Sequence, residues 1–422
     1  MKRLRTRVIA LYLMLLIVTG CSVQPITQEE DASPHPYGTA TSERAPSVPS
    51  VRLGFHYKPL SDNTSKQTLA QQASFMILTQ NDETFRDELR AEGYDGLVLQ
   101  YVLANEIDGP RALRGSDACD TEFKPWQNQA ANQAGDFCRL IHPYGDWFLH
   151  NSQGERLYEE WEGRTFYHMN PRSEGWRKFM LDRLKQRMFG DERTPPLGYD
   201  GIFFDNLELT IRKAEYQLTN SDGTVQEYGS DEEYRAAWLD WLAYMRKGLG
   251  TTVPIWANMV AGRETGDEWN IFMPYLDGMM HESFVTGYEG SPFTPAKQTN
   301  SLKQAEHAIA QGKGVYLIAQ GARDDQQLQQ FALASYLLVM QPDAQTYFRY
   351  TKARAGGYDE WWAYDNYNTN LGLPIGPRYK IKNGWRRDFV HGYVTVDQVE
   401  RTGTIVQQRQ SASPTPNSKK NS

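Results

Sequence analysis

The feature that most constrains the fold of this 422-residue chain is a regular alternation of short apolar segments with longer amphipathic ones. This alternation is typical of βαβ units, in which the strands form a parallel sheet and helices cover it. Eight alternations predict an α/β fold, a (β/α)8 TIM barrel. The segments expected to form its strands are VRLGFHY (51–57), SFMIL (74–78), GLVLQYV (96–102), GIFFDN (201–206), PIWANM (254–259), GMMHES (278–283), GVYLIAQ (314–320) and TYFRYT (346–351).

The segments between these strands have the periodicity of helices with one buried face. In residues 173–189, Trp176, Met180 and Leu184 fall on one face, and the segment begins with Ser173, a suitable N-cap. Further helices are expected at 231–249 and 326–340. An open doubly wound sheet is the alternative, but no glycine-rich phosphate motif follows the first strand.

Long insertions interrupt the repeating pattern at residues 105–171, 207–230 and 352–396. Because the loops that follow barrel strands build the active-site face, these long βα-loop insertions are expected to wall a site. The last of them ends in WRRDFVHGYVTVD, which predicts a small C-terminal β-hairpin with its turn at His391-Gly392.

The N-terminus has the layout of a secretory signal peptide. Four basic residues precede the apolar run Val8–Val18, which is too short to span a bilayer as a resident helix. The residues Val18-Thr19-Gly20-Cys21 resemble a bacterial lipobox, which implies cleavage before Cys21 and acyl chains on a lipidated Cys21. An ordinary signal peptide with an incidental cysteine is the alternative.

These features predict an exported protein of the bacterial cell envelope, anchored to a membrane through Cys21. In a host with two membranes, Ser22 resembles an outer-membrane sorting signal. Pro, Ser, Thr and Glu dominate the residues after the anchor, as in flexible stalks. The expected organisation is a lipoprotein signal peptide (1–20), the lipidated Cys and a disordered stalk (21–50), the barrel domain (51–403) and a disordered tail (404–422).

The charge balance narrows the range of partners. Cleavage of the signal peptide removes four of the 45 Lys and Arg, which leaves 41 against 52 Asp and Glu, a net charge of −11. Such a surface argues against nucleic acid or anionic lipid as a partner.

The two remaining cysteines, Cys119 and Cys138, are expected to form a disulfide in an exported protein. The bond would close a loop of about twenty residues, a constraint worth about 3 kcal/mol in the chain-entropy model. No His or third Cys stands at ligand spacing from them, and neither an HExxH nor a GxSxG motif occurs. The sequence therefore predicts no metal ion, no cofactor and no serine nucleophile.

Three segments share an Asp-Gly turn, a mostly apolar strand and a polar end: YDGLVLQY (94–101), YDGIFFDN (199–206) and LDGMMHES (276–283). Alternation along the second strand predicts that Phe203 and Asp205 share one face and Phe204 the other. Five residues after each Asp of the turn stands a polar side chain, and these three are expected in one layer at the C-terminal rim of the barrel: Gln100, Asp205 and Glu282.

Two carboxyl groups that converge from separate strands in an aromatic cleft suit glycoside hydrolysis. One must be ionised to attack or stabilise the sugar, and the other must hold a proton for the leaving oxygen. Asp205 is expected to be the nucleophile, or the base in an inverting enzyme, and Glu282 the acid. Glu208 is the alternative acid.

Other polar and aromatic residues at predicted strand ends or in the insertions are expected to contact a sugar. Their hydroxyl, amide, imidazole and guanidinium groups suit hydrogen bonding, and the aromatic rings suit stacking. A structural role in packing or backbone satisfaction is the alternative for each. These substrate-binding residues are His56, Tyr57, Gln100, Tyr101, Trp147, Asn206, Trp256, Asn258, Arg349 and Trp361.

The motifs LGFHY, MNPRSEGWRKFM, YDGIFFDN, LDGMMHES, GLPIGPR and WRRDFVHGYVTV resemble those of a group of bacterial glycoside hydrolases with TIM-barrel folds. They are similar to the hypothetical glycosyl hydrolase families near the endo-α-1,4-polygalactosaminidases, over most of residues 51–397. In the related α-galactosidase clan the nucleophile ends the fourth strand and the acid/base ends the sixth, which implies Asp205 and Glu282. Glu282 stands where that clan usually has Asp, and His391 where such families tend to have Asn.

The sequence thus predicts a glycosidase with an extracellular poly- or oligosaccharide as substrate. A non-catalytic glycan-binding lipoprotein on the same barrel is the alternative, because a fold does not fix a function. A structural envelope protein is a third hypothesis. Of the three, only the glycosidase needs the carboxylate pair.

Overall fold

A computed structural model of the chain describes residues 51–57, 59–110, 120–141, 145–161, 163–260, 268–355 and 357–408. The predicted signal peptide, Cys21, the stalk and Cys119 lie outside the described residues, as does the tail beyond residue 408. Cys138, the other member of the predicted pair, is disulfide-bonded. Among the described residues, no helix combines the length and the apolar character needed to cross a membrane.

The central element is a closed eight-stranded barrel in which each strand runs parallel to its neighbours, in the order β1-β11-β10-β9-β8-β7-β3-β2. All eight predicted segments are strands of this barrel, so the predicted (β/α)8 architecture is confirmed. The strands are β1 (Leu53–Tyr57), β2 (Ala73–Leu78), β3 (Leu97–Leu103), β7 (Gly201–Glu208), β8 (Ile255–Val260), β9 (Gly278–His281), β10 (Gly314–Gly321) and β11 (Thr346–Lys352).

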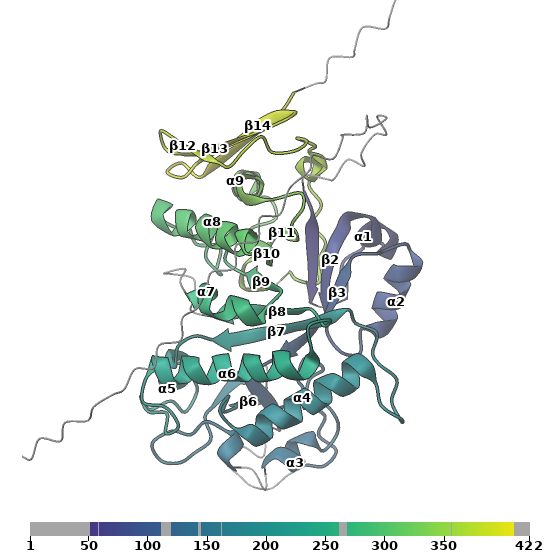
Figure 1. The fold of residues 1–422 in the computed structure, drawn as a ribbon, viewed down its shortest axis with the longest axis vertical. Helices are drawn as coiled ribbons and strands as arrows, with labels where there is room; N and C mark the ends of the chain where they lie inside the picture. The colour runs from purple at the N-terminus through teal and green to yellow at the C-terminus, as the bar shows by residue number, and fades with distance from the viewer. Residues whose placement is uncertain are drawn as a thin grey trace, which may run out of the picture. The chain divides into compact units, whose positions relative to one another are not determined.

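Helices lie around the outside of these strands (Figure 1). The three predicted from periodicity are α4 (Glu174–Phe189), α6 (Asp231–Leu249) and α9 (Gln326–Val339). Ser173 caps α4 as expected, because its side chain accepts a hydrogen bond from the Trp176 backbone N–H. The others are α1 (Lys66–Gln72), α2 (Glu83–Ala91), α3 (Asp136–Ile141), α5 (Arg212–Tyr216), α7 (Glu268–Phe272) and α8 (Pro295–Ala310).

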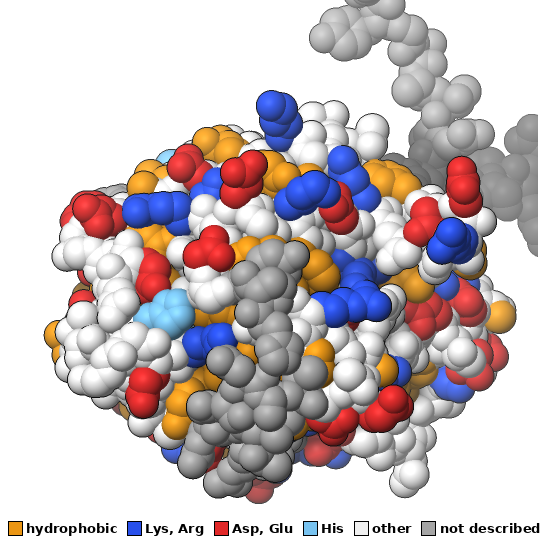
Figure 2. Space-filling model, turned by 90° about the horizontal axis from the view of Figure 1, so that it is seen from below, with side chains coloured by type: hydrophobic (Ala, Val, Ile, Leu, Met, Phe, Trp, Pro, Cys, Tyr) orange, Lys and Arg blue, Asp and Glu red, His pale blue; other side chains and the backbone are white. Residues whose placement is uncertain are grey.

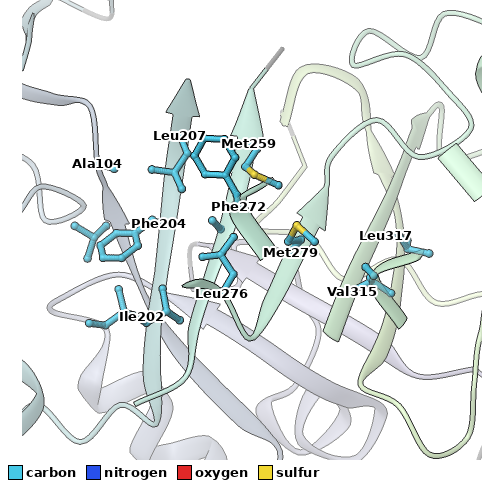
Figure 3. Close-up of a cluster of buried hydrophobic side chains, with 14 of the residues drawn as sticks. Ala104, Ile202, Phe204, Leu207, Met259, Phe272, Leu276, Met279, Val315 and Leu317 are labelled. Atoms are coloured by element: carbon cyan, nitrogen blue, oxygen red, sulfur yellow. The ribbon is translucent and has the colours of Figure 1, made fainter. Parts of the chain in front are cut away.

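Alternation along the strands produces two hydrophobic layers. Phe203 points into the barrel, where it belongs to the interior cluster, whereas Phe204 belongs to the layer between strands and helices, against Trp241 of α6. Figure 3 shows part of the outer layer, with Phe204, Leu207, Met259 and Met279 projecting from neighbouring strands. The predicted orientation of Phe203 and Phe204 is confirmed.

The insertion after β3 forms a small antiparallel sheet of its own, in the order β4-β6-β5. Its strands are β4 (Glu106–Gly109), β5 (Tyr158–Trp161) and β6 (Arg164–His168). The sheet occupies the part of the chain predicted to wall a site, and its residues return in the functional site below.

The predicted C-terminal hairpin is part of a larger sheet. Strands β13 (Gly384–Phe389) and β14 (Gly392–Asp397) pair as expected, and β12 (Tyr379–Ile381) and β15 (Thr402–Gln407) extend them to four antiparallel strands. This sheet lies over α9, which contacts β14 and β15 (Figure 1). Because β15 ends at Gln407, regular structure continues four residues beyond the predicted domain end at 403.

The described surface carries both signs of charge. On the face shown in Figure 2, Lys and Arg side chains are interspersed with Asp and Glu.

Candidate functional site

A cavity of about 540 Å³ opens at the C-terminal ends of the barrel strands. We call the part lined by barrel strands its barrel end, and the part lined by the insert sheet β4-β6-β5 and α5 its insert end. Five of the predicted site residues line it: Asp205, Glu282, His56, Tyr101 and Asn206. The remaining lining residues are Leu103, Glu106, Trp126, Asn128, Glu159, Trp161, Phe166, Lys213, Gln217, Met280, Tyr288 and Tyr358.

Asp205 is aimed into the cavity by a local irregularity of β7. The pairing of β7 with β8 shifts register between Phe204 and Leu207, and Asn206 within the shift has φ +56°. Such a bulge redirects side chains, and Asn tolerates the left-handed conformation better than most residues. The Asp205 carboxylate accepts hydrogen bonds from the Tyr101 hydroxyl, the Asn206 backbone N–H at 2.9 Å and Asn258 Nδ2 at 3.0 Å.

Glu282 directly follows β9, two strands away in the barrel order. Its Oε1 accepts a hydrogen bond from the Tyr358 hydroxyl at 2.7 Å, and its Oε2 accepts one from Asn258 Nδ2 at 3.0 Å. Like Asp205, it is partly exposed to the cavity.

Asn258 of β8 joins the two carboxylates through one amide nitrogen. Because Asp205 Oδ1 and Glu282 Oε2 each lie 3.0 Å from that nitrogen, the two oxygens are no more than about 6 Å apart. Two acidic groups held this close at the mouth of a barrel are the arrangement that glycoside hydrolysis requires.

More than half of the sequence matches a known protein family. Residues 120–393 match a family described as Hypothetical glycosyl hydrolase family 15. The chain belongs to this family. It is therefore a glycosidase, with a TIM-barrel fold as the resemblance implied.

The solved structures that align with this glycosidase share little sequence with it. The glycoside hydrolase domain of PelA from Pseudomonas aeruginosa aligns over 75% of this chain and 98% of its own, with 15% identity and a TM-score of 0.44. The alpha-N-acetylgalactosaminidase NagBb from Bifidobacterium bifidum, in a GalNAc complex, aligns over 85% of this chain with 11% identity and a TM-score of 0.44.

The alpha-galactosidase TtGalA from Thermus thermophilus aligns over 80% of this chain, with 12% identity and a TM-score of 0.41. The chain spans 58% of NagBb and 65% of TtGalA, so both contain substantial regions that it does not match. No curated protein matches the sequence of this glycosidase.

Arg349 of β11, predicted to contact the sugar, instead organises the loop that carries Tyr358. Its guanidinium donates hydrogen bonds to the carbonyls of His56 at 2.8 Å, Gly357 at 3.1 Å, Tyr358 at 3.0 Å and Glu360 at 2.8 Å. These hydrogen bonds fix the backbone on both sides of Tyr358. The Tyr358 hydroxyl is thereby positioned to donate to Glu282. Arg349 thus acts on the site through Tyr358.

His56 and Tyr57 end β1. His56 lines the cavity, its ring centroid 4.1 Å from that of Tyr358 and its Nδ1 3.3 Å from the Tyr316 hydroxyl. Burial, followed by the charge of Arg349, holds the pKa of His56 well below its ordinary value, so the imidazole is neutral. The Tyr57 side chain lies outside the described residues.

Gln100 does not join the carboxylates. It pairs in register with Ile202 of β7, whereas Asp205 pairs with Leu103, and its neighbours Leu99 and Tyr101 take the interior face of β3. Gln100 therefore points away from the cavity and is fully buried. Gln100 and Asp205 each stand five residues after the Asp of an Asp-Gly turn, but neighbouring barrel strands are staggered. The same number of residues therefore does not place the two side chains in one layer.

The three tryptophans expected to stack on sugars are packing residues. Trp256 is fully buried inside the barrel, where Gly278 leaves room for its ring: a Cβ on Gly278 would lie 2.3 Å from it. Trp147 packs against Trp176 and Phe179 of α4. Trp361 packs on Phe55 and donates a hydrogen bond from Nε1 to Gln72 Oε1 at 2.7 Å. All three lie outside the lining of the cavity.

The aromatic wall of the cavity comes from residues that the sequence did not single out. Trp126, Trp161 and Phe166 belong to the insertion after β3, and the Trp126 ring lies 5.7 Å from Trp161 and 5.4 Å from Phe166 between centroids. Trp161 is 53% exposed, which leaves its face available to a ligand. In the sequence, this wall was indicated only by the several Trp residues in the insertion at 105–171.

Glu208, the alternative acid, is a structural residue. It is buried and accepts hydrogen bonds from Asn105 Nδ2 at 2.9 Å and from the Tyr234 hydroxyl at 2.6 Å. Burial raises the pKa of Glu208, and its side chain is not among those that line the cavity.

A second acidic group lies at the insert end of the cavity. Burial raises the pKa of Glu106 to about 8, although the nearby Lys213 lowers it. Burial alone would lower the pKa of Lys213, but the charges of Glu106, Glu208 and Glu159 outweigh that effect and raise it. His168, behind them, is fully buried, and burial together with Lys213 keeps its pKa well below the ordinary value.

Proposed function

We propose that this glycosidase hydrolyses an extracellular poly- or oligosaccharide with retention of configuration, using Asp205 as nucleophile and Glu282 as acid/base. The observation that carries the proposal is the single amide nitrogen of Asn258, which lies 3.0 Å from an oxygen of each carboxylate. A separation of about 5 to 5.5 Å between carboxyl groups is typical of retaining enzymes, and inverting enzymes need more room for a water.

The hydrogen bonds around Asp205 support its role. Three donors face its carboxylate, and together they fix the position of the oxygens that can attack the sugar. In the first step, an Asp205 oxygen forms a bond to the anomeric carbon, while the bond from that carbon to the leaving oxygen breaks. Glu282 gives its proton to that oxygen.

In the second step, Glu282 takes a proton from a water molecule, whose oxygen attacks the anomeric carbon. The bond from that carbon to Asp205 breaks, which releases the sugar and restores both carboxyl groups to their starting states. Tyr358 and Asn258 hold Glu282 throughout, so both proton transfers take place at one fixed position.

The volume and lining of the cavity support a substrate of more than one sugar. Its volume is about 540 Å³, and Trp126, Trp161 and Phe166 line it together with Asp205 and Glu282. Sugar rings present an apolar face that packs well on indole. We propose that the exposed ring of Trp161 holds a sugar unit distant from the bond that is cleaved.

The predicted signal peptide and lipobox support action outside the cytoplasm. We propose that lipid on Cys21 anchors the protein in the cell envelope, with the barrel on a stalk of about thirty residues. Labelling of the expressed protein with a radioactive or clickable palmitate analogue, compared with a Cys21→Ala variant, tests this anchoring.

The catalytic proposal is tested by screening the purified protein against a panel of glycans and aryl glycosides. Once a substrate is found, NMR of the first product identifies its anomeric form, and retention is expected. Asp205→Ala with added azide should give a glycosyl azide of the opposite configuration, because azide takes the place of the missing carboxylate. An inverted first product, or binding of a glycan with no turnover, would overturn the proposal.

A further inference from the structure

A cluster at the insert end of the cavity brings together ligand side chains from all three strands of the insert sheet. Glu106 of β4 lies directly opposite His168 of β6 in the antiparallel register. Glu159 of β5 lies opposite Phe166, two residues before His168, so its side chain leaves the sheet on the same face. Strand pairing therefore holds two carboxylates and one imidazole together.

The spacing of these groups fits a small cation. One ligand atom from each of Glu106, Glu159 and His168 lies within 4.8 Å of the other two, and His168 Nε2 is 3.6 Å from Glu106 Oε2. A transition metal bound at about 2.0 to 2.2 Å from each ligand atom holds its ligands at separations in this range.

The buried atoms of the cluster lack the partners that such atoms normally have. Among the residues that the structure describes, Glu106 Oε2 and both ring nitrogens of His168 accept or donate no hydrogen bond. His168 is fully buried and Glu106 is 5% exposed. An unsatisfied buried polar group costs about 1 to 3 kcal/mol, so a ligand at this point would remove a penalty that the folded chain otherwise carries.

The charges of the surroundings also favour a cation. Lys213 of α5 is the basic side chain paired with the cluster, with its Nζ 3.3 Å from Glu159 Oε2. It faces Glu106 and Glu159, and Glu208 behind them. Histidine is among the commonest metal ligands, and both ring nitrogens of His168 are buried next to the carboxylates. Glu106 and Glu159 line the cavity, which gives an ion a route from solvent.

We propose that Glu106, Glu159 and His168 form a binding site for one divalent transition metal, with Zn²⁺ as the best match to one nitrogen and two carboxylate ligands. The sequence motifs predicted no metal, because Glu106 lies more than fifty residues before Glu159 and His168 and meets them only through strand pairing. Three protein ligands leave a position of a tetrahedral ion open to the cavity, where a water or a sugar hydroxyl can bind.

The test uses the full chain, stripped of metal with a chelator and titrated with ZnCl₂ by calorimetry. One Zn²⁺ per chain is expected to bind, and to raise the thermal midpoint, because binding to the folded state alone stabilises it. Glu159→Gln and His168→Gln are expected to weaken binding at least tenfold. The matched control is His307→Gln, which changes an exposed histidine of α8 and should leave binding unchanged.

Two measurements keep the proposal open to refutation if His168→Gln folds poorly. Glu159 is 31% exposed at its side chain, so Glu159→Gln should retain the native circular dichroism spectrum and report on binding alone. Lys213→Met removes the competing ammonium group and is expected to tighten Zn²⁺ binding. Absence of saturable binding, equal binding by Glu159→Gln and the parent, or weaker binding by Lys213→Met would each overturn the proposal.

Discussion

The two ends of the cavity hold carboxylates in opposite ways. At the barrel end, Asp205 and Glu282 accept hydrogen bonds from Tyr101, Tyr358 and Asn258, so each group has donors that fix its orientation. At the insert end, Glu106 and His168 have buried atoms with no hydrogen-bond partner among the described residues. Carboxyl groups whose hydrogen-bond donors fix their orientation suit catalysis, which needs one geometry. Buried carboxyl groups that lack partners suit the binding of a ligand that supplies them.

The largest effect on activity is expected for Asp205→Asn, which tests whether the barrel end performs the chemistry. If the barrel end performs the chemistry, the amide removes the nucleophile and kcat/KM should fall by a factor on the order of 10⁴. The thermal midpoint should change little, because Asp205 is partly exposed and the amide keeps its shape. Asp240→Asn on α6, which is exposed and distant from the cavity lining, is the matched control. Retained turnover with a lowered midpoint would mean that Asp205 is structural.

The second prediction separates the roles of the two barrel carboxylates. Glu282→Gln should lower kcat by about 10² to 10⁴-fold on substrates with poor leaving groups. The loss should shrink on aryl glycosides whose phenolate leaves without protonation. Comparing the two substrate classes measures this difference. An equal loss on both classes would argue against Glu282 as the proton donor.

The third prediction concerns the donors that set the barrel end apart. Tyr358→Phe removes the hydroxyl that donates to Glu282 but keeps the ring that packs against His56. A hydrogen bond to a charged group is worth about 1.5 to 3 kcal/mol, so kcat should fall by roughly 10- to 100-fold. Because Tyr358 acts by positioning Glu282, KM and the thermal midpoint should stay near the parent values. A change confined to the midpoint would show that Tyr358 only packs.

The smallest effect is expected at Asn206, whose φ of +56° belongs to the bulge that aims Asp205. Asn206→Gly accepts this backbone freely and should remain close to the parent in stability. Asn206→Ala should cost about 1 kcal/mol, because Ala keeps the Cβ that disfavours the left-handed conformation but lacks the polar side chain that lets Asn adopt it. Denaturant unfolding of the two variants measures this difference. An equal stability for both would mean that the bulge relaxes when Asn206 is replaced.

The barrel could be predicted because its signals are local. Apolar runs, Asp-Gly turns and alternation within one strand were enough to predict all eight strands and the orientation of Phe203 and Phe204. The Asp of each later turn also behaves as expected, since Asp200 accepts a hydrogen bond from the Val98 N–H and Asp277 from the Ile255 N–H.

The features that could not be predicted depend on how segments distant in the sequence pack against one another. Gln100 was misplaced because the stagger between β3 and β7 is set by closure of the barrel, which a count along one strand does not contain. Trp256 and Trp361 could not be told from ligand-stacking residues, since a tryptophan in a core and one in a cleft have the same local sequence. Tyr358, Glu106 and His168 lie in insertions without repeating patterns, and only tertiary contacts bring them to the site.

The amide of Asn258 has a consequence for how the enzyme responds to acidity. Both hydrogens of one –NH₂ group are committed, one to each carboxylate. An amide does not titrate, so the brace between nucleophile and acid keeps the same charge in weakly acidic and in alkaline surroundings. The gap that a sugar must bridge is therefore spanned by a group that stays uncharged whatever the acidity of the medium.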